Sequence, residues 1–277
     1  MGRAGTVHGK VVAISGGARG IGYATARRLI DDGARVAIGD IDDERLKEAV
    51  GELGVTAYTH LDVTDPDSFA RFLDHVEDVL GPVDVVVNNA GIMPLGASAE
   101  EPDAVSRREV EINLLGVITG TKQALTRMLP RRSGHVINIS SLAGESYVPG
   151  GATYCATKHA VKAYTETVRR EYRNSGVSVS QVMPFFTNTE LVAGTSGTKG
   201  MRNVEPEDIA AAVAGLIVRP RPRVRVSKLA GAITQSQAFL PSRVSEYLGR
   251  VLGAESAFTA GVDPSARQAY EDRVRAV

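Results

Sequence analysis

The stretch Ser15-Gly16-Gly17-Ala18-Arg19-Gly20-Ile21-Gly22 decides how the fold of this chain begins. An apolar run at residues 11–15 leads into it, and a helical pattern at 21–32 follows it. Glycines between a strand and a helix let the backbone turn sharply and approach a pyrophosphate, while the helix N-terminus offers free N–H groups. Glycine clusters also occur in plain tight turns, but this placement favours a nucleotide-binding loop.

The rest of the chain repeats this alternation of short apolar runs and helical patterns. Asp65 and Pro66 form a typical helix start, an N-cap followed by proline at the first helical position. The order of elements predicts an α/β fold in a single domain, a Rossmann-type doubly wound parallel sheet in three layers (α/β/α). Further strands are expected at 35–39, 56–61, 83–87, 135–140 and 177–183, and further helices at 43–53, 66–80, 101–129 and 154–174.

Both ends of the chain fall outside this regular alternation. The last dozen residues are polar, so we expect them to be mobile. Before them we expect a helix at 207–218, a last strand at 224–227 and an amphipathic helix at 242–252. The expected divisions are a flexible N-terminus at 1–9, a dinucleotide-binding catalytic domain at 10–230 that includes a substrate loop at 190–204, and a C-terminal helical extension at 231–277.

The composition excludes several classes of protein. The 277 residues fit one large α/β domain, and 32 basic residues balance 32 acidic ones, so nucleic acid is not expected as a partner. The single cysteine, Cys155, cannot form an internal disulfide, which suits the reducing cytoplasm. No apolar stretch approaches the roughly 20 residues that span a bilayer, and the five histidines lack metal-ligand spacing. We therefore expect a cytoplasmic protein without a metal site.

Asp40 closes the second expected strand, where an acidic side chain can accept hydrogen bonds from the adenosine ribose hydroxyls. A carboxylate there would repel the 2′-phosphate of NADP. Two other interpretations are open: Asp40, Asp42 and Asp43 could form a solvated turn, and Arg19 could attract a 2′-phosphate. Because a carboxylate at the ribose itself outweighs a mobile arginine, the sequence favours NAD over NADP.

Tyr154 and Lys158 lie four residues apart in an expected helix and therefore share one face. A phenol has an ordinary pKa of about 10, and a neighbouring ammonium favours phenolate and lowers that pKa. With a hydroxyl from Ser141 to bind the substrate oxygen, these groups form a general acid/base site for carbonyl chemistry. A tyrosine and a lysine at this spacing also occur on many exposed helices, so the pair needs support from the rest of the sequence.

That support is a set of motifs that stand together. The sequence resembles the short-chain dehydrogenase/reductase family in its single-domain form, from about Lys10 to Thr189, with the family's order and spacing. The spacing includes the 13 residues from Ser141 to Tyr154. The matching pieces are Ser15-Gly16-x-x-x-Gly20-Ile21-Gly22, Asp62-Val63, Asn88-Asn89-Ala90-Gly91, Asn113 in Ile-Asn-Leu-Leu-Gly, Ser140-Ser141, Tyr154-x-x-x-Lys158 and the segment 184–189.

The resemblance implies a nicotinamide-dependent oxidoreductase in which Tyr154 protonates a carbonyl oxygen or deprotonates an alcohol. Lys158 would lower the phenol pKa and hold the nicotinamide ribose, Ser141 would orient the substrate oxygen, and Asn113 would hold a water in the proton path. The hydride chemistry belongs to the cofactor, and the protein supplies position and proton transfer. The expected cofactor contacts are Gly16, Arg19, Gly20, Ile21, Gly22, Asp40, Ile41, Asp62, Val63, Asn89, Ala90, Gly91, Tyr154, Lys158, Pro184, Thr187 and Thr189.

Three departures from the family pattern matter. Ser15 replaces the usual threonine and keeps the hydroxyl, whereas Phe185 replaces a glycine and adds bulk near the nicotinamide. The C-terminal part lacks the glycine-rich ending of tetrameric members. We therefore expect a homodimer through the helices at 101–129 and 154–174 in preference to a homotetramer.

The expected substrate pocket is largely apolar. We therefore expect a hydrophobic secondary alcohol or ketone, such as a terpenoid, steroid or fatty alcohol, rather than a sugar. The Gly/Ser/Thr-rich stretch at 194–200 is expected to be a mobile lid. The expected pocket residues are Met93, Pro94, Leu142, Ala143, Tyr147, Val148, Phe185, Phe186 and the segment 190–202.

Two other functions stay open. The chain could be a catalytically silent NAD(P)-binding regulatory or scaffold protein, because fold alone does not determine function. The intact set of Asn113, Ser141, Tyr154 and Lys158 argues against that alternative. The apolar residues within 239–252, with cations nearby, could also contact a membrane surface, although packing on the same domain or on a partner subunit is favoured.

Overall fold

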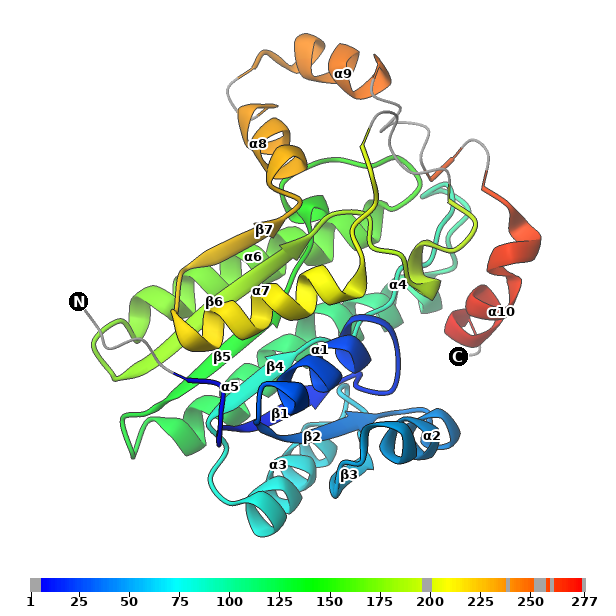
Figure 1. Ribbon diagram of the computed structural model, residues 1–277. Helices are drawn as coiled ribbons and strands as arrows, with labels where there is room; N and C mark the ends of the chain where they lie inside the picture. The colour runs from blue at the N-terminus through cyan, green and yellow to red at the C-terminus, as the bar shows by residue number, and fades with distance from the viewer. Residues whose placement is uncertain (1–5, 196–200, 238–239, 252–257, 260–261, 276–277) are drawn as a thin grey trace.

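One parallel sheet lies between two layers of helices (Figure 1). The computed structural model describes residues 6–195, 201–237, 240–251, 258–259 and 262–275. Within these ranges seven strands pair in the order β3-β2-β1-β4-β5-β6-β7, every pair parallel, which confirms the expected single-domain Rossmann-type fold. The strands are β1 (Val11–Ser15), β2 (Arg35–Asp40), β3 (Ala57–His60), β4 (Val85–Asn88), β5 (Gly134–Ile139), β6 (Val177–Pro184) and β7 (Arg223–Val226).

Helices cover both faces of the sheet. One face carries α1 (Gly20–Asp31), α2 (Asp43–Leu53) and α7 (Pro206–Val218), and the other carries α3 (Pro66–Leu80), α5 (Gly116–Met128) and α6 (Ala152–Glu171). Ile14 of β1 packs in the first core with Leu29, and its neighbour Ala13 packs in the second core with Phe72. Successive strand residues point to opposite faces, and both faces are buried, so β1 is a continuous apolar run.

The long helical segment expected at 101–129 is interrupted at its centre. It consists of α4 (Asp103–Val110), a π-helical turn η1 (Glu111–Leu115) and then α5. Asn113 lies within the π-helical turn. Its side-chain oxygen accepts a hydrogen bond from the Ile92 N–H, and its side-chain nitrogen donates one to the Ile92 carbonyl, at 2.8 Å each. A single π turn inside a helix often marks a functional position, because it redirects the side chains around it.

The expectation of a mobile C-terminus is wrong. Residues 264–275 form the helix α10 (Pro264–Arg275), whose Arg267, Tyr270 and Val274 are buried. The Asp263 carboxylate accepts hydrogen bonds from the backbone N–H groups of Ser265 (2.9 Å) and Ala266 (3.4 Å), and so caps this helix. A stripe of buried side chains on one face holds the helix against the body of the protein, which outweighs its polar composition.

Two further helices precede α10 and extend beyond the end of the sheet (Figure 1). They are α8 (Lys228–Gln237), which lies mostly within the expected C-terminal helical extension but was not predicted as a separate helix, and α9 (Ser242–Val251), which matches the expected amphipathic helix. Val244, Tyr247 and Val251 are exposed, so these side chains do not pack on their own domain. Residues 239 and 252, also part of the expected amphipathic segment, lie outside the described residues.

At the other end of the chain, residues 1–5 of the expected flexible N-terminus lie outside the described ranges. Val7 is buried, and the Gly9 N–H donates a hydrogen bond of 2.8 Å to the Gly33 carbonyl, so the following residues pack against α1. Across the described parts of the chain, no helix combines the length and the apolar character that crossing a membrane requires.

Candidate active site

A cavity of about 470 Å³ lies at the carboxyl ends of the strands. Its walls come from the segments that follow β1, β2, β3, β4, β5 and β6. The chain runs outward from the centre of the sheet in both directions, from β1 to β2 and from β4 to β5, so a crevice opens between β1 and β4. In doubly wound sheets this crevice is where ligands bind.

The loop after β1 forms a backbone cradle at one end of the cavity. Gly16 has a φ of +65°, and a Cβ atom on it would lie 2.9 Å from the Cα of Ala90. A Cβ atom on Gly22 would overlap the carbonyl oxygen of Gly16, so the loop and α1 pack closely only with glycine. The Asn89 amide donates to the carbonyls of Ser15 (3.0 Å) and Gly16 (2.9 Å), which joins the loop to the end of β4.

Asp40 stands at the end of β2, beside this cradle. Its carboxylate accepts hydrogen bonds from the N–H groups of Ala18 (3.0 Å) and Asp42 (3.2 Å), so the strand end and the loop hold it in place. Arg19 forms ion pairs with Asp42 and, at 3.3 Å, with Glu190. Glu190 also pairs with Arg273, so two guanidiniums and two carboxylates lie together at the mouth of the cavity.

Ser141, Tyr154 and Lys158 line the opposite wall. Ser141 follows β5 and begins the short 3-10 turn η2 (Leu142–Gly144), and its hydroxyl accepts a hydrogen bond of 3.1 Å from the Ala143 N–H. Tyr154 and Lys158 share one face of α6, and the Lys158 ammonium lies 5.5 Å from the centre of the Tyr154 ring. The expected grouping of these three side chains is thus present in the geometry.

Burial dominates the acid–base properties of this wall. It raises the pKa of the Tyr154 phenol, and a hydrogen bond with Ser141 offsets only part of that rise. It also lowers the pKa of Lys158 to about 8, against a smaller rise from the Glu109 carboxylate. In the protein alone, burial outweighs the other influences on the phenol, so the pKa of Tyr154 lies above its ordinary value. The expected lowering of that pKa by the Lys158 ammonium stays a prediction.

Asn113 lies behind Gly91 and does not line the cavity. A Cβ atom on Gly91 would stand 3.1 Å from the Asn113 side-chain oxygen and 3.5 Å from the Lys158 nitrogen, so both groups face this glycine. The Asn113 amide is fully buried and braces the backbone at Ile92. Asn113 therefore positions the loop after β4 next to Lys158.

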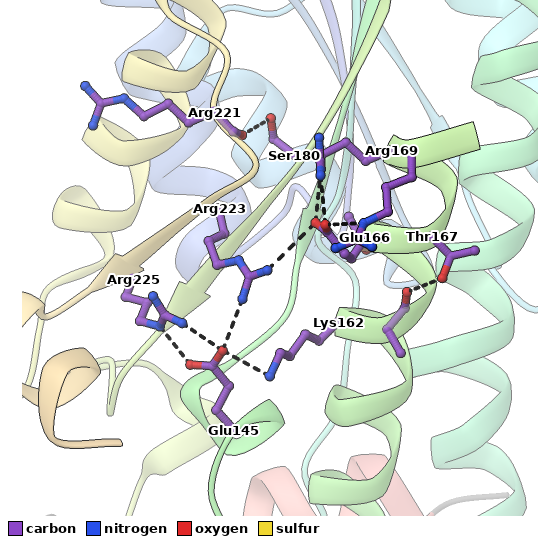
Figure 2. A network of polar contacts seen from close by, with 12 residues as sticks. Glu145, Lys162, Glu166, Thr167, Arg169, Ser180, Arg221, Arg223 and Arg225 are labelled. Carbon is purple, nitrogen blue, oxygen red and sulfur yellow. Dashed lines mark hydrogen bonds and ion pairs between the residues drawn. The ribbon is translucent and has the colours of Figure 1, made fainter. Parts of the chain in front are cut away.

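An ion-pair network surrounds Glu145, which follows the short turn η2 (Figure 2). Glu145 accepts from Arg225 of β7 at 2.7 Å and from Lys162 of α6 at 3.0 Å, with Arg223 at 3.6 Å. Burial acts to raise the pKa of Glu145, but hydrogen bonds from Arg225 and Lys162 outweigh it, so the pKa lies below its ordinary value. Glu145 thereby ties the segment after Ser141 to both α6 and the edge of the sheet.

Most of the expected pocket lines the cavity beside Tyr154, but Tyr147 does not. The Tyr147 side chain is 86% exposed and stacks on His159 at 5.5 Å, so its assignment to the pocket is wrong. Pro94 is buried next to Met93, and residues 196–200 of the expected lid lie outside the described ranges. The expected residues that do line the cavity are Met93, Leu142, Ala143, Val148, Phe185, Phe186, Glu190, Leu191, Val192 and Met201.

The expected cofactor contacts also gather in the cavity. Gly22 is the exception, because it lies beneath the loop and its role is close packing. The expected contacts that line the cavity are Gly16, Arg19, Gly20, Ile21, Asp40, Ile41, Asp62, Val63, Asn89, Ala90, Gly91, Tyr154, Lys158, Pro184, Thr187 and Thr189.

The C-terminal part supplies a wall that the sequence did not predict. Arg267 of α10 donates to the Leu191 carbonyl at 2.7 Å and to the Met93 carbonyl, so α10 joins two loops of the cavity. The signal for this helix was present, because Asp263-Pro264 repeats the start seen at Asp65-Pro66. The wall consists of Ala230, Ile233, Thr234, Phe258, Tyr270, Arg273 and Val274.

A glycine cradle, an acidic residue at the end of β2 and a tyrosine–lysine–serine wall define the class of single-domain nucleotide-dependent oxidoreductases. The chain belongs to the short-chain dehydrogenase family, whose model matches residues 10–200. The match covers β1 to β6 with their connecting helices, and α7 to α10 follow it.

Three dehydrogenases are similar to this chain over most of its length. The 2,5-dichloro-2,5-cyclohexadiene-1,4-diol dehydrogenase LinX of Sphingobium indicum is 35% identical over 189 residues, 67% of this chain and 76% of LinX. The 3-alpha-(or 20-beta)-hydroxysteroid dehydrogenase of Mycobacterium tuberculosis is 35% identical over 226 residues, 81% of this chain and 82% of that protein. The cis-4-hydroxycyclohexanecarboxylate dehydrogenase of Sinomonas cyclohexanicum is 33% identical over 261 residues, 91% of this chain and 97% of that protein.

Proposed function

We propose that this protein transfers a hydride between NAD(H) and a hydrophobic secondary alcohol or ketone, with Tyr154 as the general acid and base. One observation carries the proposal: Ser141, Tyr154 and Lys158 line the same cavity as the glycine cradle and Asp40. A nicotinamide dinucleotide lying along the cavity from the cradle would bring its ring to the tyrosine wall.

The residues present fit a dinucleotide. Only glycine fits at Gly16 and Gly22, so the backbone of the cradle can approach a pyrophosphate closely. The N-terminus of α1 favours the negative charge of that pyrophosphate. Asp40 would hold the adenosine ribose, and Lys158 the nicotinamide ribose. When bound, the nicotinamide supplies the hydride acceptor or donor.

The protein's own part is proton transfer and orientation. In alcohol oxidation the ionised Tyr154 takes the hydroxyl proton, and in ketone reduction the neutral phenol gives a proton to the carbonyl oxygen. The Ser141 hydroxyl donates a hydrogen bond to the substrate oxygen and so holds that oxygen beside the phenol. Asn113 and Gly91 keep the loop after β4 in contact with Lys158, so the lysine stays near the phenol.

The charges around the ribose end support NAD over NADP. Arg19 and Arg273 are cations that could attract a 2′-phosphate, yet Asp42 and Glu190 already pair with Arg19, and Glu190 also pairs with Arg273. With Asp40 beside them, a phosphate would meet three carboxylates. Because like charges at short range repel, the free ribose hydroxyls of NAD suit this site better.

The substrate end supports an apolar, ring-shaped alcohol. Met93 and Phe258 are buried with Tyr154 in one hydrophobic cluster, and the Phe186 ring lies 5.0 Å from that of Phe258. The three similar dehydrogenases are named for a cyclohexadiene diol, a hydroxysteroid and a hydroxycyclohexane carboxylate. A polar sugar would leave its hydroxyls without partners on this surface.

A panel of alcohols tests the proposal, with NADH formation as the readout. Cyclohexanols and hydroxysteroids should be turned over with NAD⁺, whereas small polyols should not. Binding of NADH without turnover of any alcohol or ketone would instead favour the catalytically silent regulatory protein. Turnover of polyols alone would contradict the apolar substrate class.

We also propose that the protein is a homo-oligomer. Val110 and Leu115, at the junction of α4 and α5, are exposed apolar residues on one of the two long helical segments expected to form a dimer. Sedimentation should therefore give a mass above that of one chain, and vesicles should not retain the protein. A monomer that binds vesicles would support the membrane-surface alternative for α9.

A further inference from the structure

Glu109 is a buried carboxyl next to the proposed catalytic wall. It lies on α4 with no exposed surface. One carboxyl oxygen accepts a long hydrogen bond of 3.3 Å from the Asn113 amide, and the other is buried without a hydrogen-bond partner among the described residues. An unpartnered buried carboxyl oxygen costs free energy, so a structural role alone does not explain a glutamate at this position.

The surroundings of Glu109 link it to the acid–base groups. Glu109 accepts a hydrogen bond from Asn113, and the side chains of Asn113 and Lys158 both lie against the backbone of Gly91. The positive charge of Lys158 acts to lower the pKa of Glu109, and the negative charge of Glu109 acts to raise the pKa of Lys158. The titratable groups that face Glu109 are Glu101 before α4, Tyr154, Cys155 and Lys158 on α6, and Glu271 on α10.

The two acidic neighbours are themselves held by donors. Glu101 accepts hydrogen bonds from Thr153 at 2.6 Å and Ser106 at 2.5 Å, and Glu271 pairs with Arg267 at 2.5 Å. Burial, with added repulsion from Glu101 and Glu271, raises the pKa of Glu109 to about 8. Because burial also lowers the pKa of Lys158 to about 8, the two groups change charge in the same pH range.

We propose that Glu109 is a positioning residue whose charge keeps Lys158 protonated at alkaline pH. When Glu109 is ionised, its carboxylate lies next to Asn113, which faces the same glycine as Lys158, and its charge favours the ammonium form of Lys158. An ionised Lys158 then remains beside Tyr154, where it favours the phenolate that alcohol oxidation needs. The kinetic part of this inference rests on the proposed function, but the charge coupling does not.

Glu109→Gln tests the proposal, because it removes the charge and keeps the shape. With any alcohol that is turned over, the alkaline limb of the kcat/KM profile should move to lower pH by about one unit. Glu109→Asp should restore part of the lost range, since it returns a carboxyl. Glu111→Gln is the matched control: Glu111 lies on the next turn with a side chain 48% exposed, and its profile should match the unmodified protein.

Infrared difference spectroscopy gives a readout that needs no substrate. The unmodified protein and Glu111→Gln should show the carbonyl stretch of a buried carboxylic acid that disappears as the pH rises through about 8, and Glu109→Gln should lack it. If this band behaves as expected and no alcohol is turned over, the proposed reaction is wrong, while Glu109 is still the buried acid that titrates near pH 8. A band that is unchanged in Glu109→Gln, or an alkaline limb that does not move in this variant, would overturn the inference.

Discussion

The backbone N–H of Met93 donates a hydrogen bond of 2.7 Å to the Tyr270 hydroxyl, so the last helix of the chain closes the wall of the active-site cavity. The two residues are far apart in sequence, and Tyr270 is buried. Tyr270 also lies under the guanidinium of Arg267, 4.7 Å from its ring centre. The C-terminal part is thus a component of the site in the same chain.

Tyr270→Phe should weaken this wall. The change leaves the buried Met93 N–H without its acceptor, which should cost about 1 kcal/mol of unfolding free energy. The KM for an apolar alcohol should rise more than kcat falls, because Tyr154 is untouched. Urea unfolding and steady-state kinetics measure the two effects. Tyr147→Phe is the control, since that exposed ring lies outside the cavity, and an equal effect of both changes would contradict the role of α10.

Gly22→Ala should abolish dinucleotide binding while the chain still folds. The added methyl would overlap the Gly16 carbonyl, so the loop must move away from α1 and lose its cradle shape. Fluorescence titration with NADH measures the loss. Gly51→Ala provides the control, because a Cβ atom there meets open space in α2. Normal NADH affinity in Gly22→Ala would show that the cradle does not hold the pyrophosphate.

Asp40→Ser should change the cofactor preference. Without the carboxylate, NAD affinity should fall about tenfold, since a charge-assisted hydrogen bond to the ribose is lost. NADP affinity should rise, because one of the three carboxylates near the ribose is gone. Isothermal titration with both cofactors measures the ratio, and Asp43→Asn, with a side chain 57% exposed, serves as the control. A preference for NADP in the unmodified protein would contradict the assignment of Asp40.

Glu145→Gln should destabilise the protein at neutral pH. Three cations surround the Glu145 side chain, which is 8% exposed. Removing its charge should lower the free energy of unfolding by about 2 kcal/mol. The loss is smaller than for fully buried pairs because the cations are partly exposed. The folded-state pKa of Glu145 is lowered, so its stabilisation is present above the unfolded pKa and is lost as the pH falls through the folded value. The difference in unfolding free energy should therefore shrink as the pH falls below about 4.

The control for that change is Glu48→Gln. Glu48 pairs with Arg45 at 2.7 Å, but its side chain is 64% exposed, so an effect of only about 0.5 kcal/mol is expected. Urea unfolding at pH 7 and at acidic pH compares the two variants. A pH-independent loss in Glu145→Gln would assign its role to shape rather than charge.

Local patterns predicted most of the sheet and the site. The run at β1, the glycines that follow it and the Asp65-Pro66 start of α3 are signals carried by a few neighbouring residues. The spacing of Tyr154 and Lys158 likewise follows from helical periodicity, which placed both on one face of α6. Predictions of this kind succeed because their cause lies within one or two turns of chain.

What sequence patterns missed depends on contacts between distant segments. The docking of α10 requires Met93 and Leu191 as acceptors, which no local pattern of residues 264–275 reveals. The π-helical turn at Asn113 follows from its bonds to Ile92, and the outward position of Tyr147 follows from its stacking on His159. The upward shift of the Tyr154 pKa depends on the burial of the phenol, which only the packed structure reveals.

Hydride transfer by Tyr154→Phe tests the central claim most directly. With cyclohexanols or hydroxysteroids and NAD⁺, the variant should lose about 10³-fold in kcat, because no other group replaces the phenol proton. NADH binding should change far less than kcat, and Tyr164→Phe on the same helix should keep its activity. Turnover by Tyr154→Phe at the rate of the unmodified protein would contradict the assignment of the tyrosine wall as the acid–base site.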